Sequence, residues 1–572
     1  MNKQLLSGDE AVARGAWESG CMVAAAYPGT PSTEILETLA TYRDVYCEWS
    51  VNEKVALEVA LGAAVAGVRS LAAMKHVGLN VAADPLFSSA YIGVKAGLVI
   101  VTADDPGLHS SQNEQDNRFY GLSAKLPVLC PSDSQEAKEF TKLGFEISEQ
   151  FDIPVLLRLT TRVAHSSTVV NLEQRVSRAP LGYEKQLHKT TLLPAFARHR
   201  HVDLEKRVVR LQQYSETTPI NRIELNDFKL GIICDGVAYH YAREVFPNAS
   251  FLKLGMVHPF PAKLALDFAD RVEEIVVIEE VDPFIELHIR ALGLKVKGKD
   301  VLPRTGELNP GIIRAALTKN TPRPAPEDDI PNRPPALCPG CPHLGIFYSL
   351  QKQKVIISGD IGCYTLGALP PHSAMDTCID MGASITFAHG ADKALNNADP
   401  RPRVAIIGDS TFFHSGITGI VNTVYNRSNV ITIITDNRTT GMTGHQNHPG
   451  TGKTLMGEET KTIDIAQLCR ACGIENVIQV DPYNLKETRK VVHKTLAEKQ
   501  PAVIISRRPC ALLVGKQGQA KAVNKEKCIG CRTCLTLGCP AISFADDKAV
   551  IIATSCVGCG MCTAICPKGA IE

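Results

Sequence analysis

Two blocks of cysteines near the end of the chain constrain its folding more than any other feature. Each block has three cysteines spaced by two residues, and a fourth cysteine that directly precedes a proline. In iron–sulfur proteins with this spacing, the fourth cysteine of each block ligates the cluster of the other block. The predicted ligand sets are therefore Cys528, Cys531, Cys534 and Cys566 for one [4Fe–4S] cluster, and Cys556, Cys559, Cys562 and Cys539 for the other.

Residues 521–572, which contain both blocks, are too few to hold a fold together by apolar burial alone. We predict a ferredoxin-like domain with two clusters. The alternative is a pair of zinc sites. Zinc needs four ligands per site and rarely takes three closely spaced cysteines with a remote fourth, so the spacing favours clusters.

Composition limits the kinds of partner. Lys and Arg together number 61 against 60 Asp and Glu, which gives no bulk charge for binding nucleic acid or an anionic membrane. The first residues lack an apolar core of signal-peptide length, and no run of about 18 uncharged apolar residues occurs. Eight of the 19 cysteines fall in the last 45 residues, at spacings that suit metal clusters rather than disulfides, so we expect a cytoplasmic protein.

The rest of the chain is predicted to form several α/β domains, because 572 residues exceed the size of a single core. Apolar runs alternate with helical stretches, as in parallel sheets. Such runs occur at 96–104, 153–159, 229–236 and 273–281. The expected domains are 1–195, 200–315 and 338–515, with a proline-rich linker at 316–337.

Polar residues follow two buried strands predicted in the third of these domains. Gly408, Asp409 and Ser410 come after RVAII, and Asp436 and Asn437 come after NVITIIT. Asp409 and Asn437 would lie side by side at the carboxyl edge of a parallel sheet, where oxygen ligands and a helix N-terminus suit Mg2+ and a diphosphate. Asp-containing turns are also common in α/β proteins that lack a cofactor, so this pair alone leaves both interpretations open.

The spacing resembles the GDG–NN signature of thiamine-diphosphate (TPP) enzymes. In that family the Mg2+ ligands are the Asp, the Asn and a main-chain carbonyl two residues on, which implies Asp409, Asn437 and the carbonyl of Thr439. The same resemblance places further residues at the cofactor, namely Gly408, Ser410, Gly441 and Met442.

A second TPP-like element lies in the first domain. In WSVNEKVALEVALGAAVAG, Glu53 stands where a strand gives way to a helix with a small-residue face. The element resembles the pyrimidine-binding motif of TPP enzymes, whose Glu hydrogen-bonds N1′ of the aminopyrimidine and promotes loss of the thiazolium C2 proton. Taken alone, Glu53 could equally be a charge that favours a helix start.

TPP-like motifs and cysteine clusters on one chain point to a family of redox enzymes. Five segments resemble the alpha subunits of indolepyruvate:ferredoxin oxidoreductases, within the 2-oxoacid:ferredoxin oxidoreductase family: YPGTPSTEI (27–35), GLHSSQNEQDNRFYG (107–121), CPGCPH (338–343), SGDIGCYTLG (358–367) and GMTGHQ (441–446). The resemblance implies two doubly wound TPP-binding domains, a transketolase C-terminal-like α/β domain and the ferredoxin-like tail. The predicted fold class is thus α/β and multidomain.

Two residues of these segments bear on the substrate. The resemblance places Thr30 near the substrate, as a catalytic residue. Met442 stands where pyruvate-specific relatives commonly have Asn, which is compatible with a larger apolar substrate. The alternative is that Met442 only packs in the core, the more common role of methionine.

The family also holds a third cluster beside TPP, bound by a CxxC pair and two later cysteines. Cys338, Cys341, Cys363 and Cys510 match that order. Cys378 is the alternative fourth ligand. The CPGC segment could instead form a zinc site or an exposed turn.

The resemblance implies TPP-dependent oxidative decarboxylation of an arylpyruvate, such as indole-, phenyl- or hydroxyphenylpyruvate, to an aryl-acetyl-CoA. Electrons would pass singly through the clusters to ferredoxin. The implied partners are coenzyme A, ferredoxin and a separate smaller beta subunit. Two other functions remain compatible with the motifs: a non-oxidative TPP decarboxylase, and an electron-relay subunit with vestigial TPP motifs.

Overall fold

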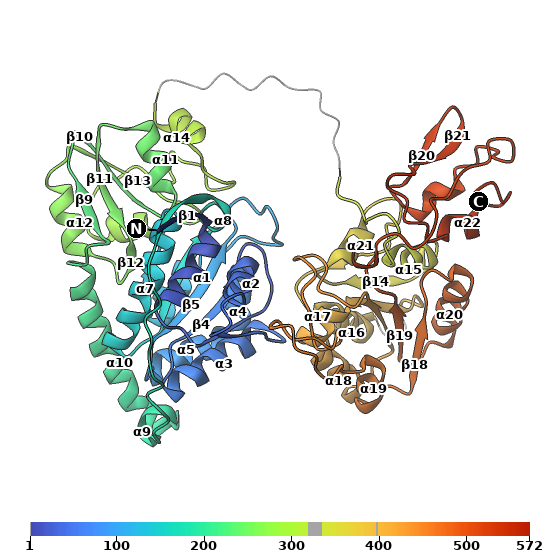
Figure 1. Ribbon diagram of the computed structural model, residues 1–572, viewed down its shortest axis with the longest axis horizontal. Coiled ribbons are helices and arrows are strands. Elements are labelled where there is room, and N and C mark those ends of the chain that lie inside the picture. Colours follow the sequence, from blue (N-terminus) through green and yellow to red (C-terminus); the bar gives the residue numbers. More distant parts are fainter. Residues whose placement is uncertain (1, 319–333, 396–397) are drawn as a thin grey trace. The chain divides into compact units, whose positions relative to one another are not determined.

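The computed structural model describes residues 2–318, 334–395 and 398–572 (Figure 1). The chain divides into two compact units, Met1–Asp328 and Asp329–Glu572. Most of the linker predicted at 316–337 lies outside the described residues. Among the residues that are described, no helix is both long enough and apolar enough to cross a membrane.

The first unit contains a seven-stranded sheet. Its strands are β2 (Val23–Ala26), β3 (Tyr46–Trp49), β4 (Ser70–Lys75), β5 (Leu98–Asp104), β6 (Val128–Leu129), β7 (Val155–Thr160) and β12 (Met256–His258). Their order is β12–β6–β7–β5–β4–β2–β3, and all neighbours are parallel except β12 and β6. The runs predicted at 96–104 and 153–159 become β5 and β7, which are buried throughout because both faces of the sheet are covered.

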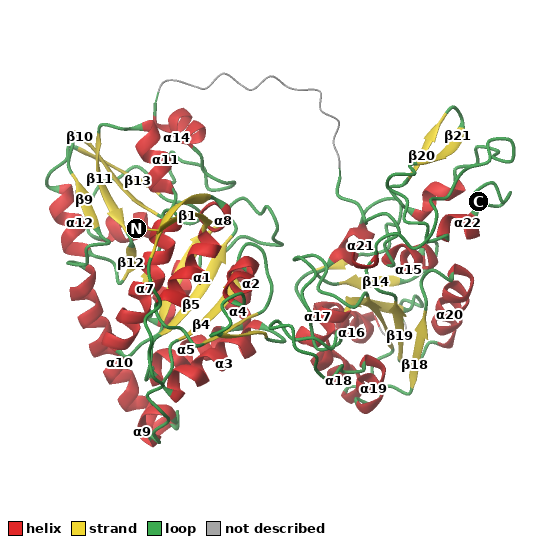
Figure 2. Ribbon diagram, viewed as in Figure 1, coloured by secondary structure: helices red, strands yellow, loops and turns green. Residues whose placement is uncertain are grey.

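Helices follow the strands in the alternation that the sequence predicts, and Figure 2 shows them packed around the sheet. They are α1 (Gly8–Glu18), α2 (Thr33–Leu39), α3 (Glu53–Ala66), α4 (His76–Val81), α5 (Ala83–Ile92), α6 (Arg118–Ala124), α7 (Ser134–Phe151), α8 (Thr161–His165), α9 (Leu187–Thr190) and α10 (Pro194–Ser215). A separate antiparallel ribbon of β1 (Asn2–Ser7) and β8 (Ser167–Leu172) pairs Ser7 with Ser167. The ribbon brings the start of α1 close to the end of α8.

A smaller four-stranded sheet completes the first unit. Its strands are β9 (Arg222–Glu224), β10 (Asp227–Asp235), β11 (Ala249–Leu254) and β13 (Glu274–Ile278), in the order β13–β10–β11–β9. Its helices are α11 (Ala238–Val245), α12 (Ala262–Ala269), α13 (Phe284–Ala291) and α14 (Pro310–Leu317). Residues 200–315 are not separate from the preceding sheet, because β12 leaves this segment to form an edge of the seven-stranded sheet.

A buried arginine ties the two sheets of the first unit together. Arg118 at the start of α6 donates to Asp116, to Asp235 at 3.2 Å and to Glu279 at 2.8 Å. Asp235 ends β10 and Glu279 follows β13, so both belong to the smaller sheet. All four side chains are buried, and removing one partner of such a group leaves an uncompensated charge.

The second unit contains a six-stranded parallel sheet. Its strands are β14 (Ile356–Gly359), β15 (Thr377–Cys378), β16 (Arg403–Gly408), β17 (Val430–Asp436), β18 (Asn476–Val480) and β19 (Ala502–Arg507), in the order β15–β14–β16–β17–β19–β18. Its helical segments are α15 (His343–Leu350), η1 (Cys363–Ala368), α16 (Ala383–Leu395), α17 (Asp409–Thr411), η2 (Phe412–Gly416), α18 (Ile417–Tyr425), α19 (Ile465–Ala471), α20 (Leu485–Glu498) and α21 (Ala511–Val514).

The cysteine-rich tail packs on this sheet domain. It consists of η3 (Thr533–Leu537), the hairpin β20 (Ile542–Ala545) and β21 (Lys548–Ile551), and α22 (Met561–Ile565). One apolar core contains Met561 and Ile571 of the tail together with Leu344 and Phe347 of α15. The tail therefore gains from its neighbour the apolar burial that it is too small to provide alone.

Candidate functional site

Oxygen atoms converge at the carboxyl edge of the six-stranded sheet. Gly408 of β16 pairs with Thr435 of β17, so Asp409 and Asn437 follow neighbouring strands. The amide oxygen of Asn437 faces Asp409 Oδ1 at 3.1 Å and the carbonyl oxygen of Thr439 at 2.8 Å. The three residues predicted to bind Mg2+ are thus brought together.

This oxygen triad fits a divalent cation. With the Asn437 amide oxygen turned inward, three oxygen acceptors meet, and Mg2+ prefers hard oxygen ligands. If the amide is turned over, its nitrogen can donate to both other oxygens, which satisfies the group without a metal. A bound cation requires the orientation with the oxygen facing inward.

His448, which the sequence analysis did not single out, orients the Asp409 carboxylate. Its Nδ1 accepts the Gly450 N–H at 3.1 Å, which leaves the ring proton on Nε2. Nε2 then donates to Asp409 Oδ2 at 3.0 Å, and both side chains are buried. Oδ1 is left to face the triad. The spacing of His448 and Asp409 along the sequence matches no known motif. The two residues meet only because the intervening loop folds back.

The electrostatics of this edge also suit a cation. Burial opposes the ionisation of Asp409, but the contact with His448 outweighs it and holds the pKa of the carboxyl below its usual value. Burial, followed by the charge of Asp409, raises the pKa of Asp436 to about 6, although Arg507 Nε lies 2.6 Å from it. Two buried carboxyl groups side by side favour a positive ion between or beside them.

Replacing His448 by Ala is expected to weaken Mg2+ binding by about 10- to 100-fold, because partners that orient a metal ligand typically contribute this much. The apparent Mg2+ affinity is measured by TPP retention of the stripped protein at increasing Mg2+. His448→Gln, which keeps an N–H donor, should recover part of the loss. His493→Ala, on the exposed face of α20, is the control. Equal Mg2+ affinity in His448→Ala and wild type would contradict the role of His448.

The other residues predicted to contact TPP lie around the triad. The Ser410 hydroxyl accepts from Thr440 Oγ1 at 2.8 Å, and the Ser410 N–H donates to Asp409 Oδ1 at 3.0 Å. A Cβ at Gly441 would lie 3.3 Å from Asn437 Nδ2, so a side chain there would crowd the triad. Met442 is 51% exposed within its unit, so the alternative of simple core packing is wrong.

Four cysteine thiols gather beside the oxygen triad. Burial and then the charge of Cys510 raise the pKa of the Cys338 thiol, and burial followed by Cys510 and Cys338 raises that of Cys363 to about 11. Cys341 is buried and its pKa is also raised, with contributions from the other three thiols. Such mutual effects require the four groups to be near one another.

The position of these cysteines favours Cys510 over Cys378 as the fourth ligand of the predicted cluster. The Cys510 N–H donates to the Asn437 carbonyl at 3.0 Å, next to the triad. A Cβ at Gly441 would lie 3.5 Å from Cys363 Sγ. Cys378 instead directs its thiol to the Asp360 carbonyl at 3.5 Å. Its electrostatic neighbours are carboxyl groups, not the other thiols.

Among the described residues, no three cysteine sulfurs are spaced as in a mononuclear zinc site. Thiolates on one zinc lie within about 4 Å of one another, because each Zn–S bond is about 2.3 Å. Among the described residues, which include every cysteine, no three sulfurs lie within 4.8 Å of one another. A cubane holds its thiolates farther apart, since each binds a different iron.

The tail presents two cavities whose linings match the crossed cysteine sets. The residues that line one cavity include Cys528, Cys531, Cys534 and Cys566. The residues that line the other include Cys539, Cys556, Cys559 and Cys562. Each cavity thus takes three cysteines from one block and the fourth from the other. The ligand assignment itself stays a prediction.

The second of these cavities adjoins the cysteines beside the triad. Pro339 and Gly340, which lie between Cys338 and Cys341, form part of its lining. Gly340 has a positive φ of 69°, and a Cβ there would lie 2.2 Å from Val557 Cγ2. The absence of a side chain therefore allows the two cysteine-bearing segments to approach closely.

The first unit carries its own group of polar residues at the carboxyl edge of the seven-stranded sheet. Glu53 begins α3, is 5% exposed, and follows Asn52, whose side chain caps the helix by accepting the Val55 N–H at 3.0 Å. A Cβ at Gly78 of α4 would lie 2.7 Å from Glu53 Oε1, so glycine leaves room for the carboxyl group. The helix start predicted for Glu53 is confirmed.

Lys75 is a further residue of this edge that the sequence analysis missed. Its side chain packs against the segment of Thr30, since a Cβ at Gly29 would lie 3.1 Å from Lys75 Cβ. Burial lowers the pKa of Lys75 to about 8, opposed by the charge of Asp105. Lys75 donates to the Ser110 carbonyl, and Asp105 accepts from the Ser110 N–H at 2.8 Å. A lysine that ends a wholly buried strand is a signal that could have revealed it.

Three family models match successive parts of the chain. They are "Pyruvate flavodoxin/ferredoxin oxidoreductase, thiamine diP-bdg" at residues 14–219, "Thiamine pyrophosphate enzyme, C-terminal TPP binding domain" at residues 360–506, and "4Fe-4S dicluster domain" at residues 520–567. The predicted combination of TPP-binding domains with a ferredoxin-like tail is thereby confirmed.

Several curated proteins are similar over the full chain. "Indolepyruvate oxidoreductase subunit IorA" of Archaeoglobus fulgidus is 44% identical over 100% of this chain and 97% of its own length. The protein of the same name from Pyrococcus horikoshii is 42% identical over 100% and 97%. Among solved structures, a 2-oxoglutarate:ferredoxin oxidoreductase from Magnetococcus marinus is 18% identical, covering 52% of this chain and 61% of that chain with a TM-score of 0.44.

Proposed function

Because this chain belongs to the family of IorA subunits of indolepyruvate oxidoreductase, we propose that it carries out the TPP-dependent oxidative decarboxylation of arylpyruvates to aryl-acetyl-CoA. The proposal rests mainly on one observation. Four cysteines suited to an iron–sulfur cluster lie directly beside an oxygen triad suited to the Mg2+ of TPP. A non-oxidative decarboxylase has no need of a redox centre at that position.

Each of the two groups of polar residues has a separate proposed task. TPP, when bound, supplies the nucleophilic carbon and the electron sink for loss of CO2. Asp409, Asn437 and the Thr439 carbonyl would hold Mg2+ and through it the diphosphate. Glu53 would hydrogen-bond N1′ of the aminopyrimidine and hold a proton there. Thr30 would lie near the substrate, on the loop that Lys75 supports.

The proposed electron path follows the order of the cysteine sets. Cys338, Cys341, Cys363 and Cys510 would hold a cluster that, when bound, could accept single electrons beside the TPP site. The next site is the cavity lined by Pro339 and Gly340, which holds Cys539 and Cys556. The cavity with the exposed Cys531 comes last and would face ferredoxin.

The proposed substrate is an arylpyruvate, and the proposed acceptor of the acyl group is coenzyme A. The exposed side chain of Met442 offers an apolar contact beside the TPP triad, which suits an aromatic group better than the methyl group of pyruvate. The relatives are named as subunits, so a smaller beta subunit is the proposed permanent partner. A reducing cytoplasm suits the free cysteines.

An anaerobic assay of the complex with its beta subunit tests the oxidative reaction. With indolepyruvate, we expect reduction of ferredoxin or methyl viologen that depends on coenzyme A, and about twelve irons per chain, as three cubane clusters require. Release of the aldehyde without dye reduction would establish the non-oxidative decarboxylase instead. Protein that retains iron and sulfide but binds no TPP would establish the electron-relay function.

A further inference from the structure

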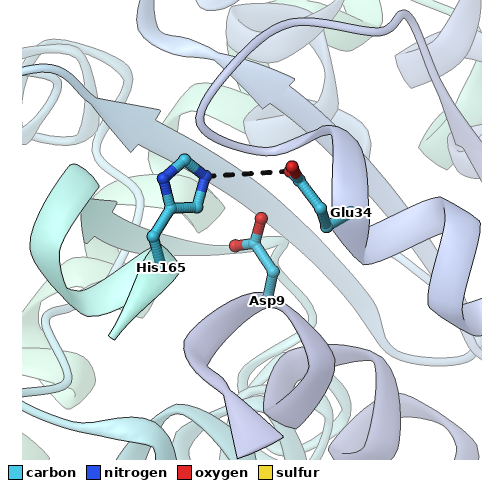
Figure 3. Close-up of side chains that lie close together, drawn as sticks. All are labelled: Asp9, Glu34 and His165. Atoms are coloured by element: carbon cyan, nitrogen blue, oxygen red, sulfur yellow. Dashed lines mark ion pairs between the residues drawn. The ribbon is translucent and has the colours of Figure 1, made fainter. Parts of the chain in front are cut away.

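Three side chains of the first unit that play no part in the proposed reaction meet at one point. Asp9 lies in the first turn of α1, Glu34 in the first turn of α2, and His165 is the last residue of α8. One ligand atom of each lies within 4.8 Å of the other two. Figure 3 shows the Asp9 carboxyl directed between the imidazole and the Glu34 carboxyl.

The Asp9 carboxyl is fully buried, and its nearest polar neighbour is the Glu34 carboxyl, which offers it no donor when both groups are ionised. Its exposure is 0%, and among the described residues neither Oδ1 nor Oδ2 meets a donor. It does not cap α1, because Ser7 and Glu10 already form a reciprocal capping box there. A buried carboxyl group without a donor is costly, so this group requires a cation or a proton.

Close packing of two chain segments sets the position of Asp9. A Cβ at Gly8 would lie 2.0 Å from the Val163 carbonyl oxygen, so glycine lets α1 approach α8. The β1–β8 ribbon aligns Ser7 with Ser167 immediately beside these helices. The packing of the backbone therefore directs the buried Asp9 carboxyl group toward His165.

We propose that Asp9, Glu34 and His165 bind a divalent transition-metal ion, with Zn2+ the best fit. Two carboxylates and an imidazole are typical zinc ligands, whereas Mg2+ and Ca2+ prefer oxygen ligands only. His165 Nε2 and Glu34 Oε2 lie 3.8 Å apart, within the roughly 4.2 Å spanned by two zinc–ligand bonds. Both side chains are partly exposed, which gives the ion an entry path and room for water ligands.

The ion would link the segment that carries Thr30 to the helices α1 and α8. Thr30 lies in a turn in which Ser32 Oγ donates to the Gly29 carbonyl at 2.8 Å. Glu34 follows Thr30 by four residues, directly after this turn. Asp9 and His165 belong to the packed pair of α1 and α8. The metal would thus join the start of α2 to this pair. The proposed site lies apart from the TPP and cluster residues, and its existence does not depend on the proposed reaction.

Zinc binding by the intact complex provides the test. The complex is purified without oxygen, loaded with TPP and Mg2+, and dialysed against low Zn2+, after which zinc and iron are counted by mass spectrometry. We expect the wild type to hold one more zinc per chain than Asp9→Asn, Glu34→Gln or His165→Gln, with iron unchanged in all. In crystals, an anomalous peak at the zinc edge should lie among the three side chains.

A second histidine–carboxylate pair supplies the matched control. His201 lies 3.2 Å from Glu205 on α10, and both side chains are half exposed. Among the described residues, no third His, Cys, Asp or Glu completes a ligand group with this pair. His201→Gln should bind as much zinc as the wild type. Equal zinc in the wild type and in His165→Gln overturns the proposal, and so does an anomalous peak elsewhere with none at this site. In those cases a proton shared by Asp9 and Glu34 neutralises the buried Asp9 carboxyl group.

Discussion

Replacing Glu53 by Gln is expected to reduce TPP-dependent turnover by about 100- to 10,000-fold, the usual contribution of a positioned acid or base. Gln is nearly the same size as Glu and fits the space left by Gly78, so α3 should remain intact. It cannot share a proton with N1′ in the way a carboxyl group can. Turnover is measured as viologen reduction, and iron content should stay at the wild-type level.

A second readout separates this role from a structural one. Exchange of the C2 proton of bound TPP with deuterated solvent should slow in Glu53→Gln, while the amount of TPP bound changes little. Glu58→Gln, on the exposed face of the same helix, is the matched control and should behave as wild type. Unchanged proton exchange in Glu53→Gln would remove Glu53 from the mechanism.

Replacing Cys510 by Ala is expected to remove one cluster, lowering the iron content from about twelve to about eight per chain. Ala is chosen because a serine oxygen can still bind iron. The proposed third cluster would lie beside the oxygen triad, so without it TPP should still bind but its electrons should not reach the tail clusters. Ferredoxin reduction should therefore fall to background, although the tail clusters remain visible by electron paramagnetic resonance.

Cys378→Ala is the matched control for this experiment. Cys378 lies in the same sheet domain and is likewise partly buried, but its thiol points to the Asp360 carbonyl. Its removal should leave iron content and ferredoxin reduction near wild-type values. If Cys378→Ala loses four irons and Cys510→Ala does not, then Cys378 is the fourth ligand and the proposed assignment is wrong.

Several features of the fold could be predicted because their causes are local. The buried strands β5, β7 and β17 are mostly apolar, so their sequences reveal them without knowledge of their neighbours. Glu53 follows Asn52, a residue type that favours helix starts, and α3 begins there. The paired cysteine cavities of the tail follow from ligand spacing in the same way.

Features that depend on long-range packing could not be predicted. Strand β12 joins a sheet whose other strands lie far earlier in the chain. No local sequence pattern predicts that pairing. The choice between Cys510 and Cys378 depends on which strand end faces Asn437. His448 reaches Asp409 only because the intervening loop folds back over the sheet edge.

The amino-acid sequence was enough to identify the family of this protein and its TPP-binding and iron–sulfur domains, because coenzyme and cluster motifs place their residues at short, recognisable intervals. The folded chain was needed to show which of these ligands share a site and what supports them. Lys75 beneath the Thr30 loop and the Asp9, Glu34 and His165 group both arise where distant segments pack together. Contacts of that kind depend on the free energy of the whole core, which no short stretch of residues encodes.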